Sequence, residues 1–449
     1  MAGGTWLSQT KIRPGAYTNF RAYATPLIQV GDRGIATIAL PLKWGAEGSL
    51  IEVLSSDLVD GKSRAKVGFT AFDTADSLAL RLILQNCYKC LVYRTTTGGV
   101  KASANATAFV ATAKYAGSKG DLLTIQVADS KFVTGNFRVT TFFDGLEVDA
   151  QEITTVADLV DNDFVTFTDS EQPLVEVASA VFTGGTDGTA TNSTAYPAYF
   201  NLLKTAKWQT MALIEDHATI NPLALTFIKN MRDDNGRKVQ LCTYNYETAD
   251  YEGVISSDQG YKTATETITV QMFPAFVAGI TAGAKINESN TYKTVNDAVS
   301  ITGELTNEEI IVALGKGKFL ISTKQDGTIV VEKDINTFTS FTPTKDYTFS
   351  KNRAIRVMDE IATSVLTVWE NSYVGKVGNS TTGRALFKAD VIAYIKELQR
   401  IEAVDSDYVP EDHIVVAKGD KIDAVTGNIY QLPVLDAMEI LYLDVEVKG

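Results

Sequence analysis

The chain has only two histidines, His217 and His413, that could act as a general base. His217 is the better candidate, because it follows Asp216 at the end of an apolar segment, Thr210 to Ile214, that is typical of a strand. Ligands of α/β folds often bind at strand ends. No Gly-x-Ser-x-Gly nucleophile motif accompanies this pair. The simpler interpretation of Asp216 and His217 is that they are hydrogen-bonded loop residues. The sequence therefore predicts no catalytic residue.

The three cysteines give little support for a metal or redox site. Cys87 and Cys90 have the spacing of a redox or half-zinc motif, but a zinc site needs four ligands, and only Cys242 and the two histidines remain. A thioredoxin-like pair needs its first cysteine at a helix N-terminus. Here the pair follows a helical pattern at 75–85 and precedes an apolar segment at 91–93. We interpret it as apolar packing between a helix and a strand.

Three polar segments resemble ligand-binding loops only loosely. Gly184 to Gly188 lacks the lysine and the terminal Ser or Thr of a phosphate-binding loop. Gly315 to Lys318 links a predicted helix to a predicted hairpin and does not begin a helix. Asp233 to Gly236 lacks the glutamate that a calcium loop needs at its twelfth position. Each is interpreted as a turn, and the sequence predicts neither a metal nor a cofactor.

Composition indicates a large globular protein. The 449 residues are 45% hydrophobic and 21% charged, which suffices for roughly two to four domains with substantial cores. No apolar run is long enough to span a bilayer, and no signal pattern opens the sequence, so we expect folding in the cytoplasm. A formal charge of −13 argues against direct nucleic-acid binding through a basic surface and favours partners with basic patches.

The last residues of the sequence alternate as a β-strand does. Period-two spacing places four apolar side chains, Leu441, Leu443, Val445 and Val447, on one face. We expect this strand to pair with a partner elsewhere, because no following strand can form a hairpin with it. The alternative is that it folds back onto its own domain.

The first 20 residues form a second expected arm. They show little helical periodicity, contain Trp6, and reach Pro14-Gly15 before any regular element begins. Two extended arms on a large body suggest a subunit that pairs strands with its neighbours.

Between the arms, the composition and the apolar periodicity of the sequence change several times. Short alternating runs at 123–127, 137–143, 147–149 and 165–167 predict a β-sandwich, with Asp144-Gly145 as a hairpin turn. Unbroken apolar strands alternating with helices after residue 190 predict a parallel sheet covered on both faces. Six regions are therefore expected: an arm (1–20), a small α/β domain (21–94), a β-sandwich insertion (95–183), an α/β domain (184–342), an α/β C-terminal domain (343–435) and a C-terminal arm strand (436–449).

The helices and strands of these regions are predicted as follows. Strands are expected at 34–40, 51–54, 91–93, 210–214, 239–243 and 414–416, with a hairpin at 319–323 and 328–331. Helices are expected at 73–85, 196–207, 222–233, 307–314, 351–373 and 383–401, and the helix at 307–314 has a Thr306/Glu309 capping box. The segment from 272 to 281 is apolar and rich in Gly and Ala.

Several short sequences, in this order along nearly the whole chain, resemble the contractile tail sheath proteins of bacteriophages and phage-tail-like particles, in the branch typical of Gram-positive hosts. Each is only moderately specific, but their order is hard to obtain by chance. They are Arg13 to Tyr17, Pro41 to Gly45, Gly184 to Gly188, Ala278 to Gly283, Asn290 to Lys293, Lys351 to Arg356, Gly378-Asn379 and Gly383-Arg384.

This resemblance implies a subtilisin-like α/β core without catalytic residues, an outward β-sandwich insertion and a C-terminal domain that faces an inner tube. It also implies arms that add strands to sheets of adjacent subunits, and we place those contacts at Thr5, Trp6, Leu7, Ile12, Leu441, Leu443, Val445 and Val447. Basic residues Lys351, Arg353 and Arg356 are the expected tube contacts, as basic groups on a strongly acidic protein. The alternative is a solvated first turn, although basic groups there are unfavourable with the helix dipole, which favours an external acidic partner.

The implied partners are further copies of the chain in a helical sheath, a tail tube protein, and baseplate and tail terminator proteins, with neither nucleic acid nor membrane contacted directly. The expected location is a virion tail or tail-like particle that is assembled in the cytoplasm of a host bacterium. Two other classes stay open at this point. One is a hydrolase with a subtilisin-like or esterase-like core, and the other is a β-rich surface or shell protein.

Overall fold

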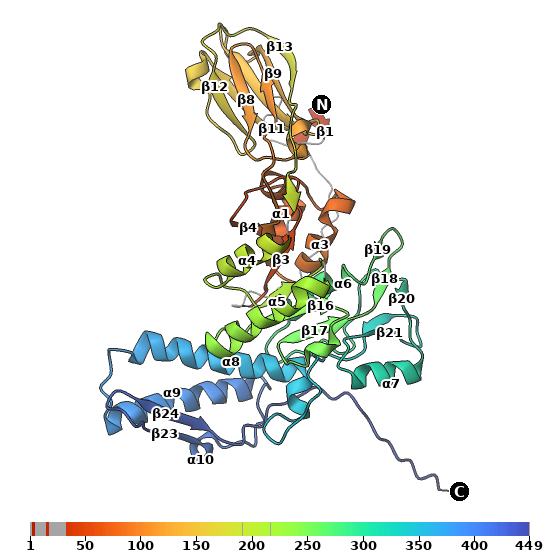
Figure 1. Ribbon diagram of the computed structural model, residues 1–449, viewed down its shortest axis with the longest axis vertical. Helices are drawn as coiled ribbons and strands as arrows, with labels where there is room; N and C mark the ends of the chain where they lie inside the picture. The colour runs from red at the N-terminus through yellow and green to blue at the C-terminus, as the bar shows by residue number, and fades with distance from the viewer. Residues whose placement is uncertain (1, 5–14, 18–32, 191, 216, 449) are drawn as a thin grey trace. The chain divides into compact units, whose positions relative to one another are not determined.

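A computed structural model describes residues 2–4, 15–17, 33–190, 192–215 and 217–448. The chain divides into two compact units, one containing most residues up to Lys207 and the other beginning at Trp208. Figure 1 shows a mixed α/β architecture in which helices and strands alternate along much of the chain. This confirms the mixed α/β fold class.

The first unit contains a small α/β layer. Strand β3 is buried at every position and pairs in parallel with β5, while β4 runs antiparallel to β5 on its other side. The hydroxyl groups of Thr37 on β3 and Tyr199 on α4 lie 2.6 Å apart, so α4 is fixed against this layer. The elements are β3 (Ile35–Leu40), β4 (Leu50–Leu54), α1 (Ser55–Asp60), α2 (Ser63–Val67), α3 (Thr74–Leu84), β5 (Lys89–Arg94) and α4 (Asn192–Leu203).

Two antiparallel sheets follow β5 and enclose a common apolar core. One has the strand order β11-β10-β9-β13, and the other has the order β12-β8-β7. Trp44 is fully buried in this core against Phe143 and Phe164. Asp144 and Gly145 both have positive φ, which confirms the predicted hairpin turn. The strands are β7 (Ser103–Asn105), β8 (Phe109–Ala113), β9 (Leu123–Asp129), β10 (Phe137–Phe143), β11 (Leu146–Ile153), β12 (Val165–Asp169) and β13 (Val177–Val181).

Buried Arg94 links the sandwich to the small α/β layer through hydrogen bonds. Its guanidinium donates hydrogen bonds to the carbonyl oxygens of Gly45, Ala116 and Asp187 over 2.9, 2.7 and 3.3 Å. Burial lowers the pKa of Arg94 although nearby carboxylates oppose the effect. Strands β6 (Thr96–Thr97) and β14 (Thr189–Ala190) pair antiparallel where the chain enters and leaves the sandwich. Three-residue β1 (Ala2–Gly4) and β2 (Gly15–Tyr17) pair with each other in parallel.

The second unit contains the predicted parallel strands. β15 pairs with β16 and β16 with β17, all in parallel, and every residue of the three strands is buried. Helix α6 is buried along nearly its whole length, which explains the Gly- and Ala-rich apolar segment seen in the sequence. These elements are β15 (Thr210–Ala212), α5 (His217–Lys229), β16 (Gln240–Tyr244), β17 (Val254–Ser257) and α6 (Phe273–Gly283).

Smaller elements complete the middle of the chain. The Thr306/Glu309 capping box of α7 is present, with Thr306 N donating to Glu309 Oε2 over 2.8 Å. The hairpin predicted near Asp326-Gly327 is also confirmed. The elements are β18 (Gly260–Lys262), β19 (Thr267–Ile268), β20 (Ser300–Thr302), α7 (Asn307–Gly315), β21 (Ile321–Thr323) and β22 (Ile329–Val331).

The C-terminal part of the second unit packs two long helices against a short hairpin (Figure 1). Helix α8 ends in a π-helical turn, Trp369–Tyr373, and α9 packs on β23. The elements are α8 (Asn352–Val368), α9 (Thr381–Arg400), α10 (Pro410–His413), β23 (Ile414–Lys418) and β24 (Val425–Ile429). Short helical turns occur at Ser118–Leu122, Val156–Asp158, Asn230–Asp234, Glu247–Ala249 and Tyr347–Ser350.

Several local predictions were wrong. Helix α5 begins at His217, five residues before the predicted start, and contains Pro222. Helices α1 and α2 and strands β7, β8, β13 and β24 were not predicted, because each is short and lacks a clear apolar period. By contrast, the segment at 441–447 was expected to pair with a partner elsewhere; it has no strand partner within the described chain, and its pairing with another copy stays a prediction.

Candidate assembly interface

The residues with the strongest catalytic or metal-binding patterns do not form a site. His217 is the first residue of α5 and Asp216 lies outside the described residues. His413 ends α10, with its ring stacked on Tyr408 at 5.0 Å. Within the described ranges, no group of three His, Cys, Asp or Glu side chains could hold a metal ion.

All three cysteines are buried thiols. Burial raises the pKa of Cys87 to about 12, and it also raises the pKa of Cys90 and Cys242. A thiol with a raised pKa is a poor nucleophile and a poor metal ligand at neutral pH. The interpretation of the Cys87–Cys90 pair as packing beside β5 is therefore confirmed.

The glycine-rich and acidic segments differ from the simple turns that were predicted: Thr186 forms an antiparallel bridge with Val100, and Asp233 lies in the helical turn Asn230–Asp234. Gly188 has a φ of 74°, and a Cβ there would lie 2.2 Å from the carbonyl oxygen of Thr97, so glycine is needed for close packing. Asp233 accepts a hydrogen bond from the Tyr251 hydroxyl over 3.0 Å, and Gly236 has a φ of 67°. Each loop therefore has a structural reason for its sequence.

The C-terminal tail, residues 440–448, is the most exposed apolar segment of the described chain. It contains no helix or strand and leaves the second unit as an extended trace (Figure 1). Its four predicted contact residues are accessible to solvent: Leu441 is 82% exposed, Leu443 75%, Val445 66% and Val447 83%. Exposure of four alternating apolar side chains is unfavourable in water, so the tail has the properties of an unpaired strand.

The other predicted linking residues cannot be placed. Thr5, Trp6, Leu7 and Ile12 lie outside the described residues, so their role in linking subunits stays a prediction.

Beside the long helices, the β23–β24 hairpin presents open strand edges. The two strands pair antiparallel from Ile414↔Ile429 to Lys418↔Val425, and no third strand joins them within the described residues. Ile414 is buried under α9, whereas Val415 on the opposite face is 44% exposed. A two-stranded sheet of this kind can accept another strand through its unpaired backbone groups.

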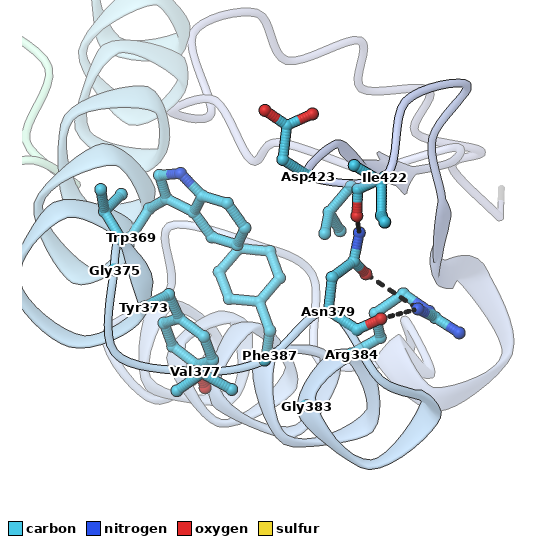
Figure 2. A pocket seen from close by; sticks show the side chains of 13 residues that line it. Trp369, Tyr373, Gly375, Val377, Asn379, Gly383, Arg384, Phe387, Ile422 and Asp423 are labelled. Carbon is cyan, nitrogen blue, oxygen red and sulfur yellow. Dashed lines mark hydrogen bonds between the residues drawn. The ribbon is translucent and has the colours of Figure 1, made fainter.

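An aromatic cavity of about 560 Å³ adjoins the turn of this hairpin (Figure 2). Trp369 and Tyr373 stack with ring centroids 5.7 Å apart, and the edge of Phe387 meets them at 4.9 and 5.0 Å. Ile422 and Val425 of the hairpin line the same space. The cavity therefore provides an apolar surface that continues from the helices to the hairpin.

Asn379 joins the two sides of the cavity. Its amide nitrogen donates to the carbonyl oxygens of Ile422 and Ala424 over 3.0 and 2.8 Å. Arg384 in turn donates to the Asn379 side-chain oxygen over 2.8 Å, as Figure 2 shows. Gly378-Asn379 and Gly383-Arg384 were among the short sequences that carry the family resemblance, but the sequence did not predict a cavity here. The aromatic i, i+4 pair Trp369/Tyr373 was the available signal.

The three predicted tube contacts already have partners inside the chain. Lys351 is 2% exposed and bridges Asp436 and Glu439, and Arg356 is 1% exposed with its Nη2 2.8 Å from Asp334 Oδ2. Arg353 donates to the backbone oxygen of Glu402 over 2.9 Å. All three cations are buried in the single chain, Lys351 and Arg356 beside carboxylates and Arg353 beside a carbonyl oxygen. The helix dipole therefore no longer requires an external acidic partner, and contact with a tube stays a prediction.

No helix in the described part of the chain is long and apolar enough to cross a membrane.

Comparisons with known proteins identify the class. Three family models match successive parts of the chain: the phage tail sheath protein beta-sandwich domain at 97–187, the central domain at 188–337 and the C-terminal domain at 344–448. The phage-like element PBSX protein XkdK of Bacillus subtilis is 31% identical, with 100% of each chain covered.

Solved structures agree. The crystal structure of the sheath tail protein from Desulfitobacterium hafniense is 34% identical and has a TM-score of 0.80, over 97% of this chain and 100% of that one. The helical sheath of the anti-feeding prophage in its contracted state is similar in fold, with a TM-score of 0.57 and 12% identity over 97% and 99% of the two chains.

These matches define a structural component of a phage tail or tail-like particle. The chain belongs to the phage tail sheath protein family. It is a structural subunit of a tail sheath, as the resemblance in the sequence predicted.

Proposed function

We propose that copies of this chain polymerise helically around a tail tube and that the resulting sheath contracts to drive the tube through the envelope of a target cell. The observation that carries the proposal is the tail at 440–448, whose four alternating apolar side chains, Leu441, Leu443, Val445 and Val447, are 66–83% exposed along one extended segment. Family membership and the fold shared with a contracted helical sheath support it.

The tail is proposed to bind a second copy of the chain. An exposed strand gains backbone hydrogen bonds by joining an open sheet edge, and its apolar face needs an apolar surface to cover. The β23–β24 hairpin offers the edge, and the aromatic cavity beside it offers apolar surface. We therefore infer that the tail of one copy adds to the hairpin of another, with side chains such as Leu443 lying over Phe387 and Ile422.

The free energy gained by burying the tail side chains supports assembly when each subunit makes several such contacts. Burial of each of the four tail residues contributes about 1.5–3 kcal/mol as an upper figure. A single contact is modest, but each subunit in a helical array makes several at once, and their effects multiply. The N-terminal arm, 1–20, with Thr5, Trp6, Leu7 and Ile12, is proposed to add a second link.

Contraction is proposed to need no nucleotide. Extended arms allow the bodies to rotate while the strands stay paired, and the interface between bodies changes from one packing to another. The free energy is stored when the sheath assembles in its longer state. The sequence has no phosphate-binding loop motif, which is consistent with contraction that uses no nucleotide.

Further partners and finer features are also part of the proposal. They are a tail tube protein, baseplate and tail terminator proteins, assembly in the cytoplasm of a host bacterium, and a tube-facing C-terminal domain at 343–435. The parallel strands β15 to β17 support a subtilisin-like α/β core, and the matched ranges of the three family models support boundaries near residues 95, 184 and 343.

Negative-stain electron microscopy of the purified chain tests the proposal. We expect tubes with helical symmetry above a threshold concentration. A synthetic peptide of residues 440–448 should inhibit their formation in a dose-dependent manner, because it occupies the acceptor hairpin. The control is the same peptide with Leu441, Leu443, Val445 and Val447 changed to serine, which should not inhibit. A chain that stays monomeric at all concentrations would refute polymerisation, and equal inhibition by both peptides would refute the tail contact.

A further inference from the structure

The tail is attached to its own body by a small set of contacts. Backbone hydrogen bonds hold the chain as far as Leu435, whose N–H donates to the carbonyl oxygen of Ala403 over 3.1 Å. Just before this, Val404 and Val434 form an isolated antiparallel bridge. Beyond Leu435, the attachments that the structure shows are made by two side chains, Asp436 and Glu439.

Both carboxylates converge on one buried ammonium group. Lys351 Nζ lies 2.5 Å from Glu439 Oε2 and 3.2 Å from Asp436 Oδ2, and the lysine side chain is 3% exposed. Thr291 holds the second oxygen of Glu439, donating from its hydroxyl over 2.7 Å. Met438 between the two carboxylates is fully exposed and Ile440 is 68% exposed. These are therefore the last contacts of the tail with its own body that the structure shows.

The environment of Lys351 favours its charged form. Burial alone would lower the pKa of Lys351, but the hydrogen bond that Lys351 donates to Glu439 and the charges of Asp436 and Glu439 outweigh burial, and the pKa is raised. If these carboxylates moved away, the buried ammonium of Lys351 would lose its counter-charges at a high cost in free energy. The ion pairs therefore hold residues 436–439, the root of the tail, against the body.

We propose that Lys351 is a positioning residue for assembly: by binding Asp436 and Glu439 it fixes the point and the direction in which residues 440–448 leave the body. This inference rests on the proposed binding of the tail to a second copy. A tail that leaves from a fixed point loses less conformational entropy on binding and has a higher effective concentration at its acceptor. Release of the root would add a flexible stretch, 436–439, between body and strand.

Two variants remove the contact from opposite sides. Lys351→Met keeps the length of the side chain without its charge, and Asp436→Asn with Glu439→Gln neutralises the tail. In the monomer, we expect the amide of Leu435, the last one that donates a backbone hydrogen bond before the tail, to exchange faster than in the wild type in both variants. The threshold concentration for tube formation should rise by about tenfold or more, as expected when a binding segment loses preorganisation. Lys396→Met, which breaks an exposed ion pair to Glu411, is the matched control and should change neither quantity.

The inference is overturned if either variant keeps the wild-type exchange rate at Leu435 or the wild-type threshold. Because both variants must agree, a folding defect in Lys351→Met alone cannot account for the expected result, and circular dichroism identifies such a defect. A chain shortened to end at Glu439 separates the two proposals. If that chain still assembles, the proposed tail contact is wrong, whereas the exchange measurement on the monomer still decides whether Lys351 holds the root.

Discussion

Replacement of both Leu443 and Val445 by aspartate should abolish tube formation and leave the monomer folded. Both side chains are exposed in the single chain, so their replacement removes no contact that stabilises the fold. In the proposed assembly each would lie against apolar surface, and the loss of about 3–6 kcal/mol per tail weakens one contact by about 10²- to 10⁴-fold. Placing two charges in an apolar cavity adds a further penalty. Sedimentation velocity and negative-stain microscopy measure the outcome.

The matched control changes the opposite face of the same segment. Asp444→Ser with Glu446→Ser alters two neighbouring positions whose side chains point away from the apolar face in an extended strand. This variant should assemble as the wild type does. Equal loss of assembly in both variants would show that the segment acts through its charge or its length and would contradict a strand with one buried face.

The second large effect concerns the fold of the second unit. Asp334 is fully buried, and its carboxylate receives hydrogen bonds from Arg356 Nη2, Asn352 Nδ2 and the backbone N–H of Asn290, each at 2.8–2.9 Å. Asp334→Ala would leave the Arg356 guanidinium buried without its counter-charge. The expected cost is about 3–5 kcal/mol in the free energy of unfolding, measured by denaturant titration with circular dichroism. Glu411→Ala, which breaks an exposed pair, should leave the unfolding midpoint nearly unchanged.

The same site predicts a dependence of stability on pH. Burial would raise the pKa of Asp334, but Arg356 and the hydrogen bonds outweigh burial, so its pKa is lowered in the folded state. The stabilisation is therefore present above the unfolded value of about 3.9 and is lost as the pH falls through the lower folded value. The acid sensitivity that Asp334 contributes should be absent in Asp334→Asn. An unchanged acid transition in that variant would contradict this assignment.

Sequence patterns identified those parts of the fold whose residues act locally. The hairpin at Asp144-Gly145 and the capping box at Thr306/Glu309 each depend on residues next to one another in the chain, and both are confirmed. Helix α5 was placed five residues late, since a proline was taken as its first residue although Pro222 lies inside it.

Contacts between distant residues could not be read from the sequence in the same way. Lys351 and its partner Glu439 are 88 residues apart, and nothing in either local pattern links them. Without that pairing, a basic first turn on α8 suggested an external acidic partner. The aromatic cavity was missed for a similar reason, because the hairpin residues that complete it belong to β24 and its preceding turn, which lack a clear strand period. The tail was identified because its alternation is strong and depends on no distant residue.

Amide hydrogen exchange of residues 440–448, compared between monomer and assembled tubes, tests most directly whether this segment becomes a strand only in a neighbouring copy. The monomer should exchange these amides at nearly the rate of an unstructured peptide, since the structure gives them no strand partner within the described chain. In tubes, alternate amides should be slowed by about a thousandfold or more, as in a paired strand. Protection already present in the monomer, or full exchange in the tubes, would contradict the account.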